Sequence, residues 1–260
     1  MVDPEAVRRT VLEMLHRSGA SHLGSSMSMV EILIAVYAAC NVEAIRGRSP
    51  ARDRVFVSKG HAAAAAYATM FHYGLLDAAT IETYHRDGSL LSGHVSHAVP
   101  HVEHSTGALG HGLPVAVGTA LGLRSRGFAN ATVFCVLGDG EIQEGSVWEA
   151  LMLAAHHRLD KLIPIVDNNR ISSIRPTREV LDMEPLGKRF SGQGFEVHQV
   201  DGHDVAAIGA AIQAIRGGAV PSVIVANTVK GKGVPFAEHQ PIWHYRSLDD
   251  QTLREALRAL

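Results

Sequence analysis

Two apolar runs in the middle of the chain flank a segment with helical periodicity. Residues 131–137 have the composition of a buried strand and end at Gly138, and residues 162–166 form a second such run that ends at Asp167. Between them, residues 145–158 carry apolar side chains at helical spacing, which predicts an amphipathic helix. Because neighbouring parallel strands need a crossover of this kind, the stretch predicts a βαβ unit.

Similar patterns on both sides of this unit extend the prediction to the rest of the chain. Strands are expected at residues 55–57, 195–200 and 223–225, and helices at residues 4–18, 28–39, 61–73, 113–125, 206–215 and 249–260, with a polar helix and turn at 80–92. In the second helix, Ser28 followed by Glu31 predicts a capping box. The alternation predicts an α/β fold, a doubly wound, mainly parallel sheet with helices on both faces. No linker interrupts it, so residues 1–260 are expected to form a single domain.

The composition narrows the class of protein. Of the 260 residues, 46% are hydrophobic and 19% are charged, which is typical of a globular domain with a sizeable core. The net charge of −2 gives no support for a nucleic-acid partner or an anionic membrane. No apolar run approaches the length of a membrane span, the amino terminus lacks the pattern of a signal peptide, and Cys40 and Cys135 are too few for a disulfide framework. A cytoplasmic protein is therefore expected.

Oxygen-bearing side chains follow both strands of the central unit. Asp139 lies between Gly138 and Gly140, and Asn169 follows the second strand. The carboxyl ends of parallel strands form the edge at which open α/β sheets bind ligands. Carboxylate and amide oxygens suit Mg²⁺, which also takes phosphate oxygens, and main-chain N–H groups at a helix start favour an anion. The pattern indicates a metal-bridged diphosphate site; the alternative is a junction in which these residues serve only turn geometry.

Several motifs resemble one family in the same order along the chain. Gly138-Asp139-Gly140 with Asn168-Asn169 resembles the thiamine-diphosphate motif of the transketolase family. Further matches are Ser58-Lys59-Gly60-His61, Ser92-Gly93-His94, the stretch 105–112 (STGALGHG) and Trp243-His244. The resemblance covers essentially the whole chain and corresponds to the amino-terminal half of a full-length transketolase. It implies a thiamine-diphosphate-binding fold and transfer of a two-carbon ketol unit from a ketose to an aldose, with sugars or sugar phosphates as substrates.

The resemblance also assigns roles to individual residues. Mg²⁺ would be held by Asp139, Asn169 and the main-chain carbonyl of Ile171. The cofactor-binding residues would be His61, Gly107, Leu109, Gly138, Gly140, Glu141, Asn169 and His244. The catalytic residues would be His22, His61, His94 and His244, which would polarise substrate oxygens and move protons, and Glu144, which would join a hydrogen-bond network linking two active sites. Structural alternatives are a solvated loop histidine for His22, a helix-capping histidine for His61 and a helix-start carboxylate for Glu144.

Other conspicuous features receive no function. Five of the 16 histidines lie between residues 94 and 111, but the spacing lacks a His-Glu-x-x-His motif or paired cysteines, so a zinc site is not expected. His97, His101 and His104 are expected to be loop histidines, and His111 is assigned no role. The stretch 230–233 (KGKG) lacks the spacing of a P-loop and is expected to form a flexible exit from the sheet. Leu23, Ala108, His111 and Tyr245 depart from the family's usual proline, proline, glutamine and glycine.

The resemblance implies a partner chain. In the family, the glutamate that activates the aminopyrimidine lies on a second, pyrimidine-binding domain, and this chain ends at Leu260 without one. A separate carboxy-terminal (pyrimidine-domain) transketolase subunit is therefore expected, in a heterotetramer with two copies of each chain. Two alternatives remain: a subunit of another thiamine-diphosphate enzyme, for acyl transfer or a specialised biosynthetic ketol transfer, or a non-catalytic homologue.

Overall fold

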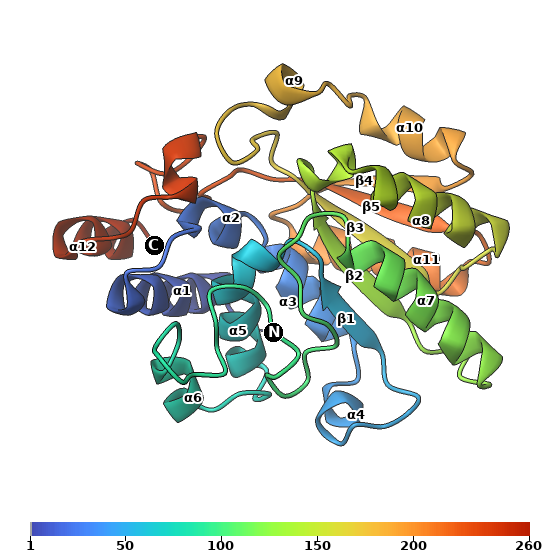
Figure 1. Ribbon diagram of the computed structural model, residues 1–260, viewed down its shortest axis with the longest axis horizontal. Helices are drawn as coiled ribbons and strands as arrows, with labels where there is room; N and C mark the ends of the chain where they lie inside the picture. Colours follow the sequence, from blue (N-terminus) through green and yellow to red (C-terminus); the bar gives the residue numbers. More distant parts are fainter. Residues whose placement is uncertain (1) are drawn as a thin grey trace.

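Five parallel strands form one sheet at the centre of the molecule (Figure 1). A computed structural model describes residues 2–260. The strands are β1 (Arg54–Val57), β2 (Val133–Gly138), β3 (Leu162–Asn168), β4 (Glu196–Asp201) and β5 (Ser222–Asn227). They are arranged in the order β1-β2-β3-β5-β4, and every neighbouring pair is parallel. The predicted βαβ unit is therefore β2 and β3 with the helix between them.

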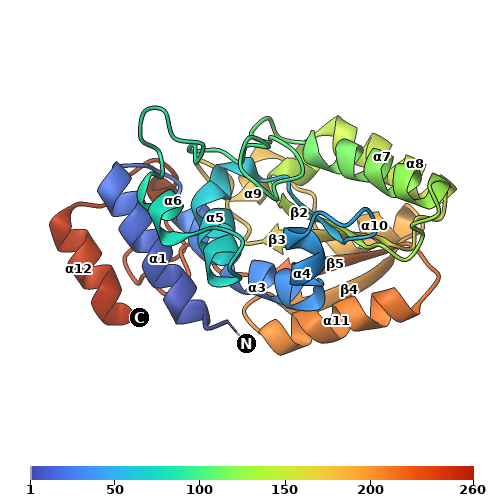
Figure 2. The ribbon, with the colours of Figure 1, turned by 90° about the horizontal axis from the view of Figure 1, so that it is seen from below.

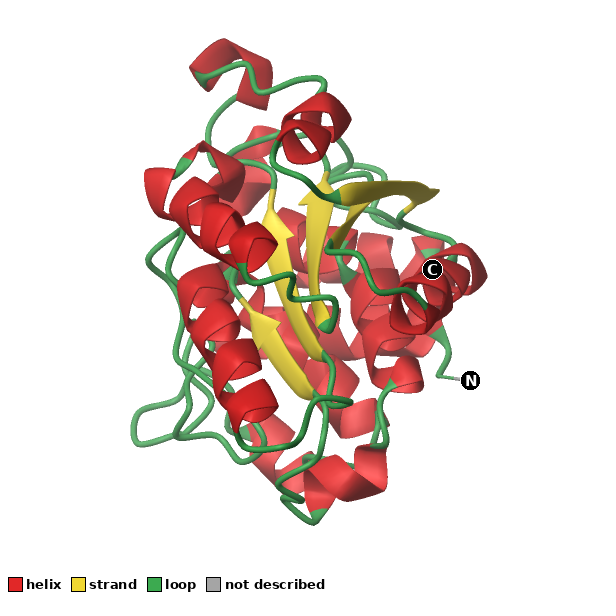
Figure 3. Ribbon diagram, turned by 90° about the vertical axis from the view of Figure 1, so that its right-hand side faces the viewer, coloured by secondary structure: helices red, strands yellow, loops and turns green. Residues whose placement is uncertain are grey.

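Helices enclose the sheet (Figure 3). They are α1 (Pro4–Ser18), α2 (Leu23–Ser28), α3 (Val30–Ala39), α4 (Val42–Arg46), α5 (Ala63–His72), α6 (Ala78–Glu82), α7 (Gly112–Ser125), α8 (Gly145–His156), α9 (Thr177–Val180), α10 (Leu186–Gly192), α11 (Val205–Gly217) and α12 (Asp250–Ala259). Short 3-10 turns are η1 (Gly60–Ala62), η2 (Glu141–Gln143) and η3 (Pro241–His244). Within residues 2–260, no helix is both long enough and apolar enough to cross a membrane.

Two hydrophobic cores lie on opposite faces of the sheet. On β2, Phe134 and Val136 face the core that contains α3 and α11, whereas Val133, Cys135 and Leu137 face the core that contains α7 and α8. Figure 2 shows these two helix pairs on either side of the sheet. A strand covered on both faces needs apolar residues at every position, which explains the uninterrupted apolar run. The predicted doubly wound α/β fold is confirmed.

One predicted helix start is wrong. Ser28 is the last residue of α2 and not the N-cap of the next helix, which follows Met29. The Ser28 hydroxyl donates to Asp167 Oδ2, and the Glu31 carboxylate accepts from the guanidinium of Arg8. Tertiary partners therefore took both members of the expected capping box.

Candidate cofactor and active site

A cavity of about 410 Å³ opens at the carboxyl edge of the sheet. It lies where β1, β2 and β3 pass into Lys59, Asp139 and Asn169. Every site residue singled out from the sequence lines it: His22, His61, His94, Gly107, Leu109, Gly138, Asp139, Gly140, Glu141, Glu144, Asn169, Ile171 and His244. The fold brings these residues together, and their individual roles stay predictions.

The predicted metal ligands lie where the chain leaves β2 and β3. Asp139 is buried; its Oδ1 accepts from the N–H of Gly140 at 2.7 Å, and its Oδ2 accepts from the N–H of Arg170. Arg170 has a positive φ of 63° and directly follows Asn169, whose Oδ1 accepts from the N–H of Ile171 at 3.1 Å. The Asp139 carboxylate is thus held against the turn that carries the other two predicted ligands.

The electrostatic surroundings of Asp139 favour a cation. Burial, followed by the nearby Asp167 carboxylate, raises the pKa of Asp139 to about 7, although the Lys59 ammonium opposes the shift. A divalent ion beside the carboxylate would stabilise its charged form and lower this pKa.

Beneath Asp139, a buried ion pair that was not predicted joins several elements. Asp167, at the end of β3, accepts from the Lys59 ammonium and from the hydroxyls of Ser28 and Thr228. Burial alone would raise the pKa of Asp167, but the Lys59 ammonium and these hydrogen bonds hold it below its usual value. The pair connects the ends of β1, β3 and β5 to α2. Lys59 and Asp167 were identifiable only as strand-end positions, because no motif assigns a role to either side chain.

Four histidine rings from separate parts of the chain face one another. The ring centroid of His22 lies 5.6 Å from that of His61, 5.4 Å from that of His94 and 4.9 Å from that of His244. The centroids of His61 and His244 are 5.2 Å apart. His22 adopts a positive φ of 75° before α2, and its N–H donates to the carbonyl of His244 at 3.0 Å. This bond holds the amino-terminal loop against η3.

Three of these imidazoles are kept neutral. Burial, then His94 and Lys230, lowers the pKa of His22 to about 4. Burial, then Lys230 and His22, lowers the pKa of His244 to about 3, and burial with Lys59 lowers the pKa of His61 well below 6.5. At neutral pH each ring therefore offers one N–H donor and one free nitrogen that can accept a proton.

The glycine-rich turn before α7 is fastened by Glu141. One oxygen of the Glu141 carboxylate accepts from the N–H of Gly110 at 2.8 Å and from the Ser58 hydroxyl, and the other accepts from the N–H of Gly138 at 3.2 Å. Gly110 has a φ of 79°, and a Cβ there would lie 2.5 Å from Ser146 Oγ. Glu141 thus supports two of the loops that line the cavity, using oxygens that a bound cofactor would otherwise contact.

Lys230 is a cavity residue that the sequence pattern missed. Its side chain is buried, and its ammonium donates to the carbonyls of Ile171 at 3.1 Å and Ser172 at 2.6 Å. Burial and the charge on Lys59 lower the pKa of Lys230 to about 8. The motif around it resembles a glycine-rich turn, and only the tertiary contacts reveal that the lysine points into the site.

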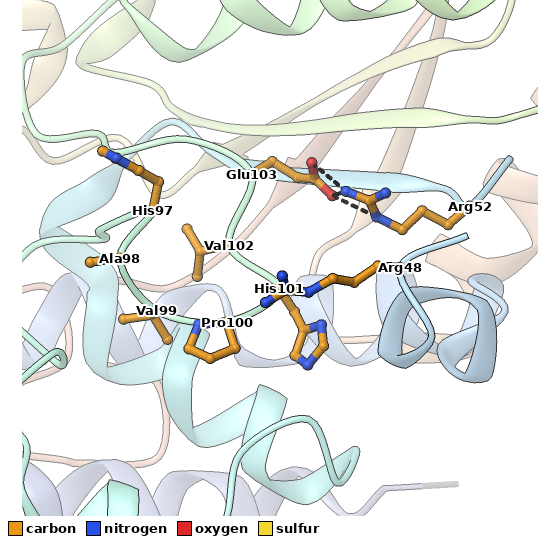
Figure 4. A pocket seen from close by; sticks show the side chains of 9 residues that line it. All are labelled: Arg48, Arg52, His97, Ala98, Val99, Pro100, His101, Val102 and Glu103. Atoms are coloured by element: carbon orange, nitrogen blue, oxygen red, sulfur yellow. Dashed lines mark hydrogen bonds and ion pairs between the residues drawn. The ribbon is translucent and has the colours of Figure 1, made fainter. Parts of the chain in front are cut away.

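The remaining histidines lie outside this cavity. His97 and His101 line a second cavity of about 240 Å³, where Arg52 holds Glu103 through hydrogen bonds of 3.0–3.2 Å (Figure 4). His104 and His111 line an open depression beside His94. In the described part of the chain, no group of three or more His, Cys, Asp or Glu side chains is arranged to hold a metal ion.

A parallel α/β sheet with a polar cavity at its carboxyl edge is typical of a cofactor-binding enzyme domain. Residues 3–260 match the family described as "Transketolase, thiamine diphosphate binding domain". The chain therefore belongs to the transketolase family of transferases, as the motifs predict.

Named relatives fall into two length classes. The chain is 38% identical to one of the separate subunits of apulose-4-phosphate transketolase from Actinobacillus succinogenes, covering 98% of this chain and 94% of the relative. It is 35% identical to 6-deoxy-6-sulfo-D-fructose transketolase subunit SqwG of a Clostridium species, covering 98% and 93%. Transketolase of Pongo abelii is 33% identical, but only 39% of its length is covered. The crystal structure of Campylobacter jejuni transketolase matches with a TM-score of 0.88 and 27% identity, over 97% of this chain and 41% of that one.

Proposed function

We propose that this chain is the thiamine-diphosphate-binding subunit of a two-chain transketolase that moves a two-carbon ketol unit from a ketose to an aldose. The observation that carries the proposal is one cavity with two chemically distinct ends. Asp139, Asn169 and the Ile171 carbonyl are oxygen donors at one end, and neutral histidines line the other.

The donor set fits Mg²⁺ and a diphosphate. A carboxylate, an amide oxygen and a carbonyl suit a hard cation that completes its octahedron with phosphate oxygens and water. In this structure the Lys230 ammonium already bonds to the Ile171 carbonyl, so that carbonyl is oriented toward a positive charge. Lys230 and Lys59 also give the cavity the positive charge that a diphosphate needs.

The chain's own residues would bind and orient the sugar. Thiamine diphosphate, when bound, supplies a nucleophilic carbon that stabilises the carbanion left by cleavage of the ketose. His22, His61 and His244 would donate hydrogen bonds to the substrate's carbonyl and hydroxyl oxygens, and their free nitrogens would accept protons from hydroxyl groups. Because their pKa values are depressed, these rings are unprotonated and ready to act as bases at neutral pH.

The partner and substrate class follow the relatives. The chain has nearly the full length of relatives named as separate transketolase subunits, and about two fifths of the length of complete transketolases. His94 and Glu144 line the cavity yet are exposed. We infer that a pyrimidine-domain subunit covers them in a heterotetramer with two copies of each chain, and that sugar phosphates are the substrates.

Reconstitution tests this proposal. The purified chain is mixed with the pyrimidine-domain chain encoded beside it, thiamine diphosphate and Mg²⁺, and ketol transfer is assayed against a panel of ketose and aldose phosphates. Activity is expected only when both chains are present. Full activity of the isolated chain would refute the two-chain arrangement, and failure of the chain to bind thiamine diphosphate would refute the cofactor assignment.

A further inference from the structure

A buried hydrogen-bond network lies on the α1–α3 side of Lys230. Glu31, in α3, accepts from Arg8 Nη1 at 2.6 Å and from Arg8 Nη2 at 2.8 Å. The same carboxylate accepts from Nδ1 of His203 at 3.0 Å. The direction of that bond is fixed because Nε2 of His203 accepts the main-chain N–H of Val229 at 2.8 Å, which leaves the ring proton on Nδ1.

The two partners of Glu31 grip the chain on either side of Lys230. His203 holds the N–H of Val229, immediately before Lys230, and Nε of Arg8 donates to the carbonyl of Lys232 at 3.0 Å, two residues after it. One carboxylate thereby fixes both ends of this short segment. None of these three side chains lines the cavity, so the network cannot touch a ligand there directly.

The Lys230 side chain also has little space to adopt another path. A Cβ on Gly24 would lie 3.1 Å from Cγ of Lys230, and the N–H of Gly231 donates to the carbonyl of Gly24 at 3.0 Å. The lysine stem therefore runs along α2 before its ammonium reaches the carbonyls of Ile171 and Ser172. A displacement of residues 229–232 would move the ammonium relative to the end of the cavity that holds Asp139.

We propose that Glu31, acting through Arg8 and His203, is a positioning residue that holds the Lys230 ammonium at the diphosphate end of the cavity. The inference rests on the proposed function. A buried ion pair contributes little net stability compared with well-packed apolar residues, so such a network is better explained by what it orients.

Calorimetric titration of the full chain with Mg²⁺ and either inorganic pyrophosphate or thiamine diphosphate tests the inference. Glu31→Gln and Lys230→Met should each raise the Kd at least tenfold, and the double variant should lose no more than the weaker-binding single variant. Asp53→Asn is the matched control, because it breaks the ion pair with Arg216 that lies at the opposite edge of the sheet. It should lower the urea midpoint while leaving both Kd values unchanged.

The outcomes separate the inference from the proposed function. A folded Glu31→Gln chain that binds like wild type, or additive losses in the double variant, would overturn the inference alone. If Glu31→Gln does not fold, His203→Ala decides by the same criteria, since His203 lies at the margin of the network. A wild-type chain that binds neither probe would remove the proposed function and the inference with it.

Discussion

The proposed metal site depends most on one side chain, the carboxylate of Asp139. Asp139→Ala removes the charged ligand, and we expect the Kd for thiamine diphosphate with Mg²⁺ to rise at least about 100-fold, since losing a group that merely supports a ligand costs about 10–100-fold. Folding should persist, because burial already disfavours this charge. Calorimetry measures the affinity, and Asp160→Ala, before β3 at the opposite edge of the sheet, is the control. Equal affinities in the two variants would contradict the assignment.

His61 should make stability depend on pH. Its pKa lies well below 6.5 in the folded chain because of burial and Lys59, whereas the unfolded chain gains a proton near pH 6.5. The stability contributed by neutral His61 is therefore complete above pH 6.5 and is lost as the pH falls toward the folded pKa. Without cofactor, the free energy of unfolding of wild type should fall more steeply between pH 6.5 and 5 than that of His61→Gln, by up to about 1.4 kcal/mol per pH unit.

Urea titrations across this range give both slopes. Asp139, whose pKa is raised, changes stability in the opposite direction, but both chains contain it and the comparison cancels its effect. Identical slopes would show that His61 is protonated to the same extent in the folded and unfolded states.

At the residue scale, sequence could identify side chains that belong to contiguous motifs, such as Asp139 and Asn169. Their position after apolar strands is a local feature, and parallel pairing then brings strand ends together. Lys230, Glu31 and Asp167 could not be assigned in this way. Their partners lie 59, 23 and 108 positions away in the chain, so their surroundings exist only in the folded molecule.

At the scale of elements, the turn into α7 depends on glycine at position 110. Gly110→Ala puts a Cβ 2.5 Å from Ser146 Oγ at a φ of 79°, and should destabilise the chain by at least about 1–3 kcal/mol. It should also weaken cofactor binding, because Gly107 and Leu109 share the turn. Gly118→Ala, inside α7 with nothing within 4 Å of the new Cβ, should instead stabilise by about 0.5–1 kcal/mol. Chemical denaturation of both variants checks the pair, and similar shifts would contradict it.

Elements were predictable in proportion to their hydrophobic signal. The strands β2 and β3 are buried on both faces and read as apolar runs. The helices α9 and α10 were not expected, because they span only 4 and 7 residues and show no apolar period. The failed capping box at Ser28 has a different cause. The local pattern was present, but a buried carboxylate on β3 offered the hydroxyl a stronger, charged acceptor.

At the scale of the whole molecule, the cavity is open on the side where a second subunit is proposed. Ile174 and Val180 line it with 62% and 50% of their surfaces exposed, and Tyr245 beside His244 is 56% exposed. Large apolar side chains gathered at the rim of a polar site are typical of a surface that another chain covers. Ile174→Asp should therefore raise the Kd for the pyrimidine-domain chain at least about tenfold, since a buried unpaired charge costs well over 1.4 kcal/mol. Val220→Asp introduces the same charge at a residue that is 49% exposed before β5, at the opposite edge of the sheet, and should associate normally. Sedimentation of the mixed chains measures both affinities. Equal weakening by the two substitutions, or by neither, would place the contact between the two chains elsewhere than the cavity rim.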